Sequence, residues 1–244
     1  MSKNKEYVSS AGLRIDGRRP LEARPINAKF GTMTSCDGGC VLEHGNARVC
    51  ASVFGPRECV NKQEARHDEA VLTCEVAIAA FASEYRSNPQ HRSKVADDIA
   101  TIVVQVASSM VLLSQYPSSQ IHIYIEVLRQ NGNEKATCIN AACLALMNAG
   151  IAMRDAVCSI NAGIIDNKLL VDLTSEEMRS QCPMVSLAVT SHDVNNIVWL
   201  ETSSRLTTES VGMLIQGAQE CIETQVWKSM KIILEDYAKE TFKE

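Results

Sequence analysis

The chain has 244 residues, of which 45% are hydrophobic and 22% are charged, and its formal net charge is −5. This composition is typical of a globular protein, and the acidic balance argues against a free-standing nucleic-acid-binding domain, because such domains are usually basic. The sequence has no unbroken run of about twenty apolar residues and no apolar leader behind basic residues. We therefore expect neither a membrane anchor nor secretion.

The ten cysteines predict neither a disulfide framework nor a zinc site. Disulfide frameworks belong to small secreted proteins, and structural zinc sites need paired Cys-x-x-Cys spacings. The nearest pairs have other spacings: Cys36 with Cys40, and Cys138 with Cys143. Most of the others stand among apolar residues and are expected to be small core side chains in a reducing nucleus or cytosol. These core candidates are Cys50, Cys74, Cys158 and Cys221.

The first half of the chain is predicted to be rich in strands. Residues 24–34 and 40–54 are expected to form two strands around a turn at 36–40, which is a hairpin signal. Residues 69–81 form a third strand-like run. The polar segment 83–94 is expected to be a loop.

A helix is predicted after this loop. It should begin near Asp97 and Asp98, because acidic residues suit the first turn of a helix. Tyr116 and Pro117 are expected to end it. Its apolar residues recur at helical spacing and would form one buried face. This face comprises Ile99, Ile102, Val103, Val106, Met110 and Val111.

The second half opens with a strand, a short turn and a helix, an order of elements that is typical of anion-binding sites. Residues 121–128 are rich in β-branched residues and predict a strand, a polar turn covers 129–135, and a small apolar helix runs from 136 to Gly150. A strand that enters a helix through a short turn directs free backbone N–H groups and the positive helix end at an anion. Glu134 lies in this turn, however, and its charge would repel an anion.

The remainder is predicted to be three or four strands and a long helix. The strands are expected at 156–165, 168–173, 184–190 and 196–201. Asp166 and Asn167 should form the tight turn between the first two. The C-terminal helix is expected to start at a cap on Thr207 or Thr208. Each half of the chain thus consists of strands followed by a helix that must cover them.

Several motifs stand in an order that one enzyme family shares. They are Arg14-Ile-Asp-Gly-Arg, Asp37-Gly-Gly39, Glu43-His-Gly-Asn46, Val53-Phe-Gly-Pro-Arg-Glu58 and Ala149-Gly-Ile-Ala-Met-Arg-Asp155. With the segment 121–150, they resemble the RNase PH family of phosphate-dependent exoribonucleases over nearly the whole chain. Within the family, the segments 14–19 and 55–58 are most similar to the eukaryotic RNA exosome ring subunit related to the archaeal catalytic chain.

The resemblance implies a fold class and a domain organisation. The fold is expected to be α/β with mixed, α+β-like sheets, in the RNase PH-like arrangement of two pseudo-similar strand-then-helix halves. Residues 13–244 would form a single RNase PH-like domain, preceded by a flexible N-terminal segment at 1–12.

The same resemblance implies that the chemistry of the family is altered here. Active members carry Thr or Ser and then Arg in the turn, where this chain has Glu134 and Lys135. Lysine lacks the planar fork with which arginine grips phosphate oxygens. The family's two downstream Asp positions match Met178 and Met184, and methionine can donate no proton. We therefore expect no catalytic residues, no metal, no cofactor and no enzymatic activity.

Binding of RNA is expected to survive this loss. In the family, basic residues of the loop before the long helix contact the RNA backbone, and the matching residues here are Arg86, Arg92 and Lys94. Lys135 completes the set of predicted RNA-binding residues. The plain alternative is that the loop residues are solvated surface charges.

The resemblance implies a non-catalytic structural subunit of the RNA exosome ring, which helps to form the channel that threads RNA for 3′-to-5′ processing and degradation. Its partners would be other RNase PH-like subunits in a hetero-hexameric ring, RNA-binding cap subunits, a separate hydrolytic nuclease and RNA. It would work in the nucleus, including the nucleolus, and in the cytoplasm. Two alternatives stay open. One is an active phosphate-dependent 3′-to-5′ exoribonuclease that uses Lys135 with Glu176 or Glu177, and the other is a different inactive ring subunit.

Overall fold

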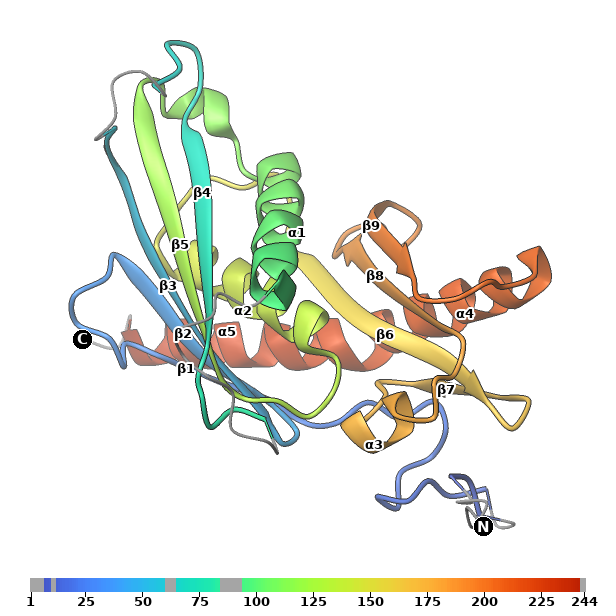
Figure 1. The fold of residues 1–244 in the computed structure, drawn as a ribbon. Coiled ribbons are helices and arrows are strands. Elements are labelled where there is room, and N and C mark those ends of the chain that lie inside the picture. The colour runs from blue at the N-terminus through green and yellow to red at the C-terminus, as the bar shows by residue number, and fades with distance from the viewer. Residues whose placement is uncertain (1–6, 10–11, 60–64, 84–93, 242–244) are drawn as a thin grey trace.

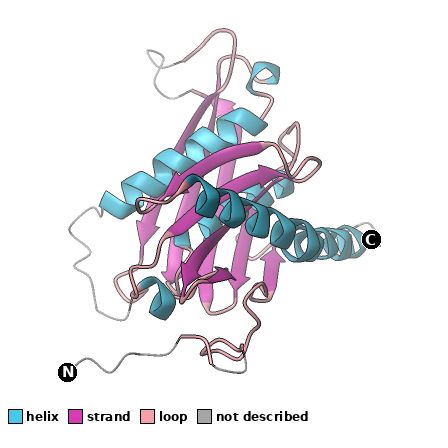
Figure 2. Cartoon of the chain, turned by 90° about the vertical axis from the view of Figure 1, so that its right-hand side faces the viewer, coloured by secondary structure: helices cyan, strands magenta, loops and turns pink. Residues whose placement is uncertain are grey.

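The computed structural model describes residues 7–9, 12–59, 65–83 and 94–241. Figure 1 shows two sheets with helices between them and outside them. A five-stranded sheet packs on helices α1 (Lys94–Met110) and α2 (Glu134–Asn148), and α2 also packs on a four-stranded sheet. Figure 2 shows helix α4 (Thr208–Cys221) in front of this second sheet. The predicted α/β fold with mixed sheets in two strand-then-helix halves is confirmed.

The first sheet has the strand order β1-β2-β3-β5-β4. Its strands are β1 (Ile26–Phe30), β2 (Gly38–His44), β3 (Ala47–Glu58), β4 (Val71–Ile78) and β5 (Ser119–Arg129). β4 is parallel to β5, and the other neighbours are antiparallel. The prediction of one strand at 40–54 is wrong, because the chain reverses at Gly45, whose φ of 58° is a conformation that suits glycine. The tight hairpin therefore joins β2 to β3.

The second sheet has the order β7-β6-β8-β9, and all its neighbours are antiparallel. Its strands are β6 (Val157–Ile165), β7 (Lys168–Val171), β8 (Met184–Thr190) and β9 (Ile197–Thr202), which confirms the four predicted strands. Asp166 and Asn167 form the predicted turn between the first two. Their φ angles of 51° and 56° are the left-handed pair that a two-residue hairpin turn requires.

The helices differ from the prediction mainly at their ends. α1 begins at Lys94 rather than near Asp97, and it ends at Met110, before a separate 3₁₀ turn η1 (Leu113–Gln115). The short helix α3 (Ser175–Met178) is not among the predicted elements. The long C-terminal helix consists of α4, a π-helical turn η2 (Ile222–Val226) and α5 (Trp227–Thr241) in direct succession. Thr207 caps α4 as expected, since its side chain accepts a hydrogen bond from the backbone of Ser210.

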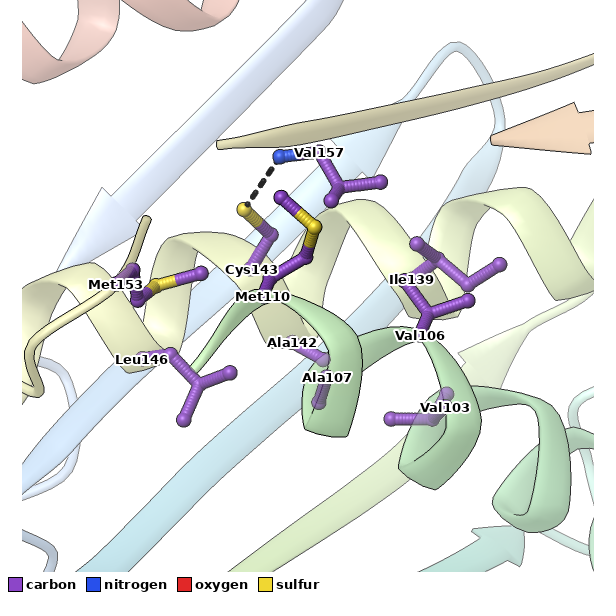
Figure 3. Close-up of a pocket in the computed structure, with 10 residues that line it drawn as sticks. All are labelled: Val103, Val106, Ala107, Met110, Ile139, Ala142, Cys143, Leu146, Met153 and Val157. Carbon is purple, nitrogen blue, oxygen red and sulfur yellow. Dashed lines mark hydrogen bonds between the residues drawn. The ribbon is translucent and has the colours of Figure 1, made fainter. Parts of the chain in front are cut away.

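Helix α2 lies at the centre of the core and is buried along most of its length. Figure 3 shows the apolar side chains that surround a small cavity where α2 packs on α1. The volume of this cavity is about 10 Å³. A space of this size only just reaches the volume of one water molecule, so it is a feature of packing and not a ligand site. Cys143 accepts a hydrogen bond from the backbone N of Val157 here, and burial raises the pKa of this thiol to about 11. Within the described part of the chain, no helix has the length and apolar character needed to span a membrane.

Candidate functional site

The turn between β5 and α2 has a backbone shape that few residues tolerate. Gly132 and Asn133 have φ angles of 75° and 61°. A Cβ atom on Gly132 would lie 2.7 Å from the carbonyl oxygen of Leu173 and from the backbone N of Ser175, so the position has no room for a side chain. The turn therefore packs directly against the chain that follows β7, and α2 begins at Glu134.

A cavity of about 90 Å³ opens beside this turn, between the beginnings of α1 and α2 and the strands β8 and β9. Four residues at which the sequence departs from the family motifs meet here: Glu134, Lys135, Met178 and Met184. The rest of the lining comprises Val95, Ile99, Asn133, Asn161, Ser186, Glu201 and Ser203. Residues that are far apart in the sequence thus converge on one pocket, which we call the turn pocket.

Each charged group of the turn pocket has a partner within the chain. The ammonium group of Lys135 lies 2.6 and 2.7 Å from the two carboxylate oxygens of Glu201. Glu134 accepts a hydrogen bond of 3.2 Å from the backbone N of Gly132, in its own turn. The pocket therefore holds two carboxylates and one ammonium group. Glu201 has no part in the sequence predictions, because nothing in its local sequence indicates that β9 places it opposite Lys135.

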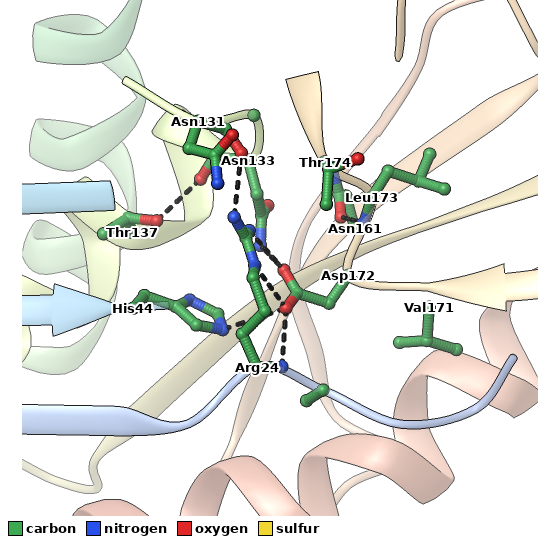
Figure 4. A network of polar contacts seen from close by, with 12 residues as sticks. Arg24, His44, Asn131, Asn133, Thr137, Asn161, Val171, Asp172, Leu173 and Thr174 are labelled. Atoms are coloured by element: carbon green, nitrogen blue, oxygen red, sulfur yellow. Dashed lines mark hydrogen bonds and ion pairs between the residues drawn. The ribbon is translucent and has the colours of Figure 1, made fainter. Parts of the chain in front are cut away.

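Behind the turn, the carboxylate of Asp172 ties separate parts of the chain together (Figure 4). Asp172 is fully buried, and it accepts hydrogen bonds from Arg24, from Nε at 2.8 Å and from Nη2 at 2.6 Å. Asn133 donates from Nδ2 to the same carboxylate at 3.2 Å. Arg24 also donates from Nη1 to the carbonyl oxygen of Asn131 at 2.8 Å. This network fixes the turn that borders the pocket.

The charged side chains of this network are buried. Burial alone would raise the pKa of Asp172, but the charge of His44 and the hydrogen bonds and charge of Arg24 hold it well below the usual range. Nε2 of His44 lies 3.3 Å from Asp172, which is within ion-pair distance but lacks hydrogen-bond geometry. Burial would lower the pKa of Arg24, yet Asp172 raises it above the ordinary value. Asp172 and Arg24 therefore form a buried ion pair and not a proton-transfer pair.

Glu177 is not available as the substitute acid that the active alternative requires. Its carboxylate is buried and pairs with the guanidinium of Arg14, whose Nε donates to it at 2.8 Å. It also accepts a hydrogen bond from the backbone N of Thr174 and so caps α3. Glu176 is exposed and does not line the turn pocket. The structure therefore places neither carboxylate in the lining of the turn pocket.

The predicted RNA-binding residues have different outcomes. Arg86 and Arg92 lie outside the described residues. Lys94 is exposed at the first position of α1, and its neighbour Val95 lines the turn pocket. Lys135 lies in the pocket itself. The structure thus brings Lys94 and Lys135 to the same region, while the RNA contacts of all four residues stay a prediction.

Comparison with models of known protein families shows to which family this chain belongs. Residues 22–152 match the model described as "3′ exoribonuclease family, domain 1", and residues 155–221 match domain 2 of the same family. The chain belongs to the RNase PH family. The predicted single domain at 13–244 and the flexible segment at 1–12 stay predictions.

Relatives within the RNase PH family cover most of the chain. The mouse (Mus musculus) protein "Exosome complex component RRP41" is 35% identical over 216 residues, which are 88% of this chain and 88% of the relative. "Exosome complex component Rrp41" of Pyrococcus horikoshii is 32% identical over 225 residues, which are 90% of this chain and 89% of the relative. The homolog from Arabidopsis thaliana is 41% identical over 173 residues, covering 70% of this chain and 71% of the relative.

Solved structures share the RNase PH fold at lower identity. Rice (Oryza sativa) Rrp46 superimposes with a TM-score of 0.79 and 19% identity, covering 89% of this chain and 98% of the rice chain. A chain of the Archaeoglobus fulgidus exosome with RNA bound to the active site gives a TM-score of 0.76 and 22% identity, covering 89% and 93% of the two chains.

The prediction that this chain is not an enzyme is contradicted by these relationships. The chain belongs to a 3′ exoribonuclease family, and its relatives include the archaeal Rrp41 proteins. The prediction rests on Glu134 and Lys135 in the turn and on Met178 and Met184, which it interprets as the loss of the phosphate cradle and of the acid. The pocket in fact retains ionisable groups in other places, because Glu201 and Lys135 face each other within it.

Proposed function

We propose that this chain is a subunit of an exosome core ring, in which it pairs with other RNase PH-family chains and contacts RNA at the turn pocket. The observation that carries the proposal is the match to exosome complex components over about nine-tenths of their length and of this chain. The archaeal exosome chain that shares its fold comes from a structure with RNA in the active site. A net charge of −5 suits a subunit whose contact with RNA is local and shared with partners.

Finer features of the assembly follow from the same proposal. The ring would contain several RNase PH-like subunits, and it would work with RNA-binding cap subunits and a separate hydrolytic nuclease. It would thread RNA for 3′-to-5′ processing and degradation in the nucleus, the nucleolus and the cytoplasm. The residues that support RNA contact in this chain are Lys135 in the pocket and Lys94 beside Val95 at its edge.

Recovery of the assembly tests this proposal. The full chain, tagged and expressed in cells of its own source, would be purified gently and its mass measured by native mass spectrometry. We expect a multi-subunit ring whose other members are RNase PH-family chains, identified from their peptides. Recovery of only this chain, alone or as a homo-oligomer, would contradict the proposal. Binding of the ring to a single-stranded oligoribonucleotide would then be measured by fluorescence anisotropy.

A second candidate function is phosphate-dependent 3′-to-5′ exoribonuclease activity at the turn pocket. One observation favours it: the pocket places an ammonium group next to two carboxylates, Glu134 and Glu201. Phosphorolysis needs a cation to hold phosphate and an acid to give a proton to the leaving ribose oxygen. Lys135 would hold the phosphate, and the carboxyl group of Glu134 or Glu201, in its protonated form, would give its proton to the leaving oxygen and become the carboxylate. Repulsion between phosphate and Glu134 predicts that such a reaction is slow.

The reaction is tested by release of nucleoside diphosphates from single-stranded RNA, with and without inorganic phosphate, using the purified ring. If this chain catalyses the reaction, release requires phosphate and disappears in the ring that carries Lys135→Ala. Phosphate-dependent release that is equal in both rings assigns the reaction to another subunit. The matched control is Lys231→Ala, because Lys231 is an exposed lysine on α5.

A further inference from the structure

The contact between Lys135 and Glu201 has the form of an anion site that is already filled. Both oxygens of Glu201 face the ammonium group, at 2.6 and 2.7 Å, as two oxygens of a phosphate would. The two residues come from different layers of the fold, Lys135 from the first turn of α2 and Glu201 from β9. Their side chains are 32% and 42% exposed, so solvent and ligands can reach the pair.

In the turn that borders the pocket, a backbone N–H group that could hold an anion is also taken by a carboxylate of the chain. The backbone N–H of Gly132 donates to Glu134 at 3.2 Å. Of the charged side chains that line the pocket, one is positive and two are negative, so their sum is −1. A phosphate that enters must therefore displace Glu201 from Lys135 and then lie close to both carboxylates. Like charges at such short distances oppose binding even where water screens them partly.

We propose that Glu201 is a specificity-determining residue of the turn pocket, whose carboxylate competes with phosphate groups for Lys135 and so sets the affinity of the pocket for them. This inference rests on the proposed function, in which the pocket is the part of the chain that meets RNA. An ion pair that is partly exposed is weak, so an incoming phosphate can open it without unfolding its surroundings. The wild-type pocket then binds free phosphate weakly, and it binds a phosphate group more tightly when other contacts of the ligand, such as those of the rest of an RNA chain, contribute.

A neutral side chain at position 201 gives the direct test. Glu201→Gln keeps the size and shape of the side chain and removes its charge. The matched control is Glu235→Gln on α5, where an exposed glutamate lies 4.0 Å from Lys231. The control changes the net charge by the same amount, and Glu235 does not line the pocket. A third protein combines Glu201→Gln with Lys135→Gln. Each full chain would be titrated with inorganic phosphate, and binding followed by ³¹P NMR.

We expect Glu201→Gln to bind phosphate about three- to ten-fold more tightly than the wild-type chain. Glu235→Gln should bind like the wild type, and the double variant should lose the gain, because the gain depends on the freed ammonium group. We expect the same ranking of affinities among these proteins when a 5′-labelled single-stranded oligoribonucleotide is added to the assembled ring.

Three results would overturn the inference. They are equal affinity of Glu201→Gln and wild type, an equal gain in Glu235→Gln, and a gain that persists in the double variant. Absence of phosphate binding by both the wild type and Glu201→Gln counts against it as well, because a freed Lys135 would then hold no phosphate. Failure of the proposed function gives a different pattern, since neither the wild type nor Glu201→Gln would then enter a ring or bind RNA.

Discussion

Arg24 binds both carboxylate oxygens of Asp172, at 2.6 and 2.8 Å, although 148 residues separate the two in the sequence. The same guanidinium donates to Asn131, and Asp172 accepts from Asn133. The segment before β1, the chain after β7 and the turn before α2 are thereby held as one unit. The position of Lys135 and Glu134 in the turn pocket depends on this unit, because both follow directly after Asn133.

Loss of the Asp172 charge should therefore destabilise the protein. Asp172→Asn leaves the guanidinium of Arg24 buried without its counter-charge, and we expect the free energy of unfolding to fall by about 3–5 kcal/mol. Urea denaturation followed by circular dichroism measures the change. The control is Asp236→Asn, which removes an exposed partner of Lys239 and should change stability by less than about 0.5 kcal/mol. Equal stability of the two variants would show that the network contributes little.

The lowered pKa of Asp172 predicts a particular dependence of stability on pH. Because the folded-state pKa lies below the unfolded value of about 3.9, the stabilisation is present above that value and is lost as the pH falls towards the folded pKa. Between about pH 5 and about pH 3, the wild type should lose about 1 kcal/mol more stability than Asp172→Asn. Asp155 also contributes to the pH dependence: burial favours a higher pKa, but hydrogen bonds from Ser191 and His192 lower it. The wild type and Asp172→Asn share this contribution, so it cancels in the comparison. Parallel losses in urea titrations of the two proteins would contradict the assignment.

The close packing of the turn predicts opposite effects for two glycine substitutions. Gly132→Ala forces a Cβ to within 2.7 Å of the backbone after β7 and keeps a positive φ, so we expect a loss of about 1–3 kcal/mol. Gly212→Ala in α4 meets nothing within 4 Å and should be neutral or stabilising by up to about 1 kcal/mol. Thermal unfolding by calorimetry compares the two. A tolerated Gly132→Ala would mean that the turn has more room than the structure shows.

Burial of the cysteines predicts which thiols resist alkylation. Burial raises the pKa of Cys40 to about 12 and that of Cys143 to about 11, and only the thiolate form reacts. In the native protein at about pH 8, iodoacetamide should label the half-buried Cys36 first, while Cys40 and Cys143 react only after unfolding. Mass mapping of tryptic peptides gives the order. Early labelling of Cys143 would show that the core between α1 and α2 opens.

Much of the fold can be predicted from local patterns, and the errors have local causes. The four strands of the second sheet follow from apolar runs and the turn at Asp166 and Asn167. β2 and β3 were merged in the prediction because both are apolar, although Gly45 before Asn46 is a turn signal. Helix α3 also has a signal, since Thr174 and Glu177 have the spacing of a capping box.

The site is less accessible to sequence reasoning, because its contacts join distant segments. The turn and its unusual residues Glu134 and Lys135 can be found from the family motifs. The partner of Lys135 is a glutamate on β9, and no local pattern distinguishes Glu201 from other exposed strand residues. Likewise, Asp172 stands in an ordinary apolar run, and only the fold shows that Arg24 reaches it.

Photo-crosslinking of RNA to the assembled ring tests the central claim most directly. A single-stranded oligoribonucleotide with 4-thiouridine near its 3′ end would be irradiated with the purified ring, and the crosslinked peptides of this chain identified by mass spectrometry. The account predicts crosslinks in the segments that line the turn pocket, around Lys135, Met184 and Glu201. Crosslinks confined to other surfaces of the chain, or to other subunits alone, would contradict it.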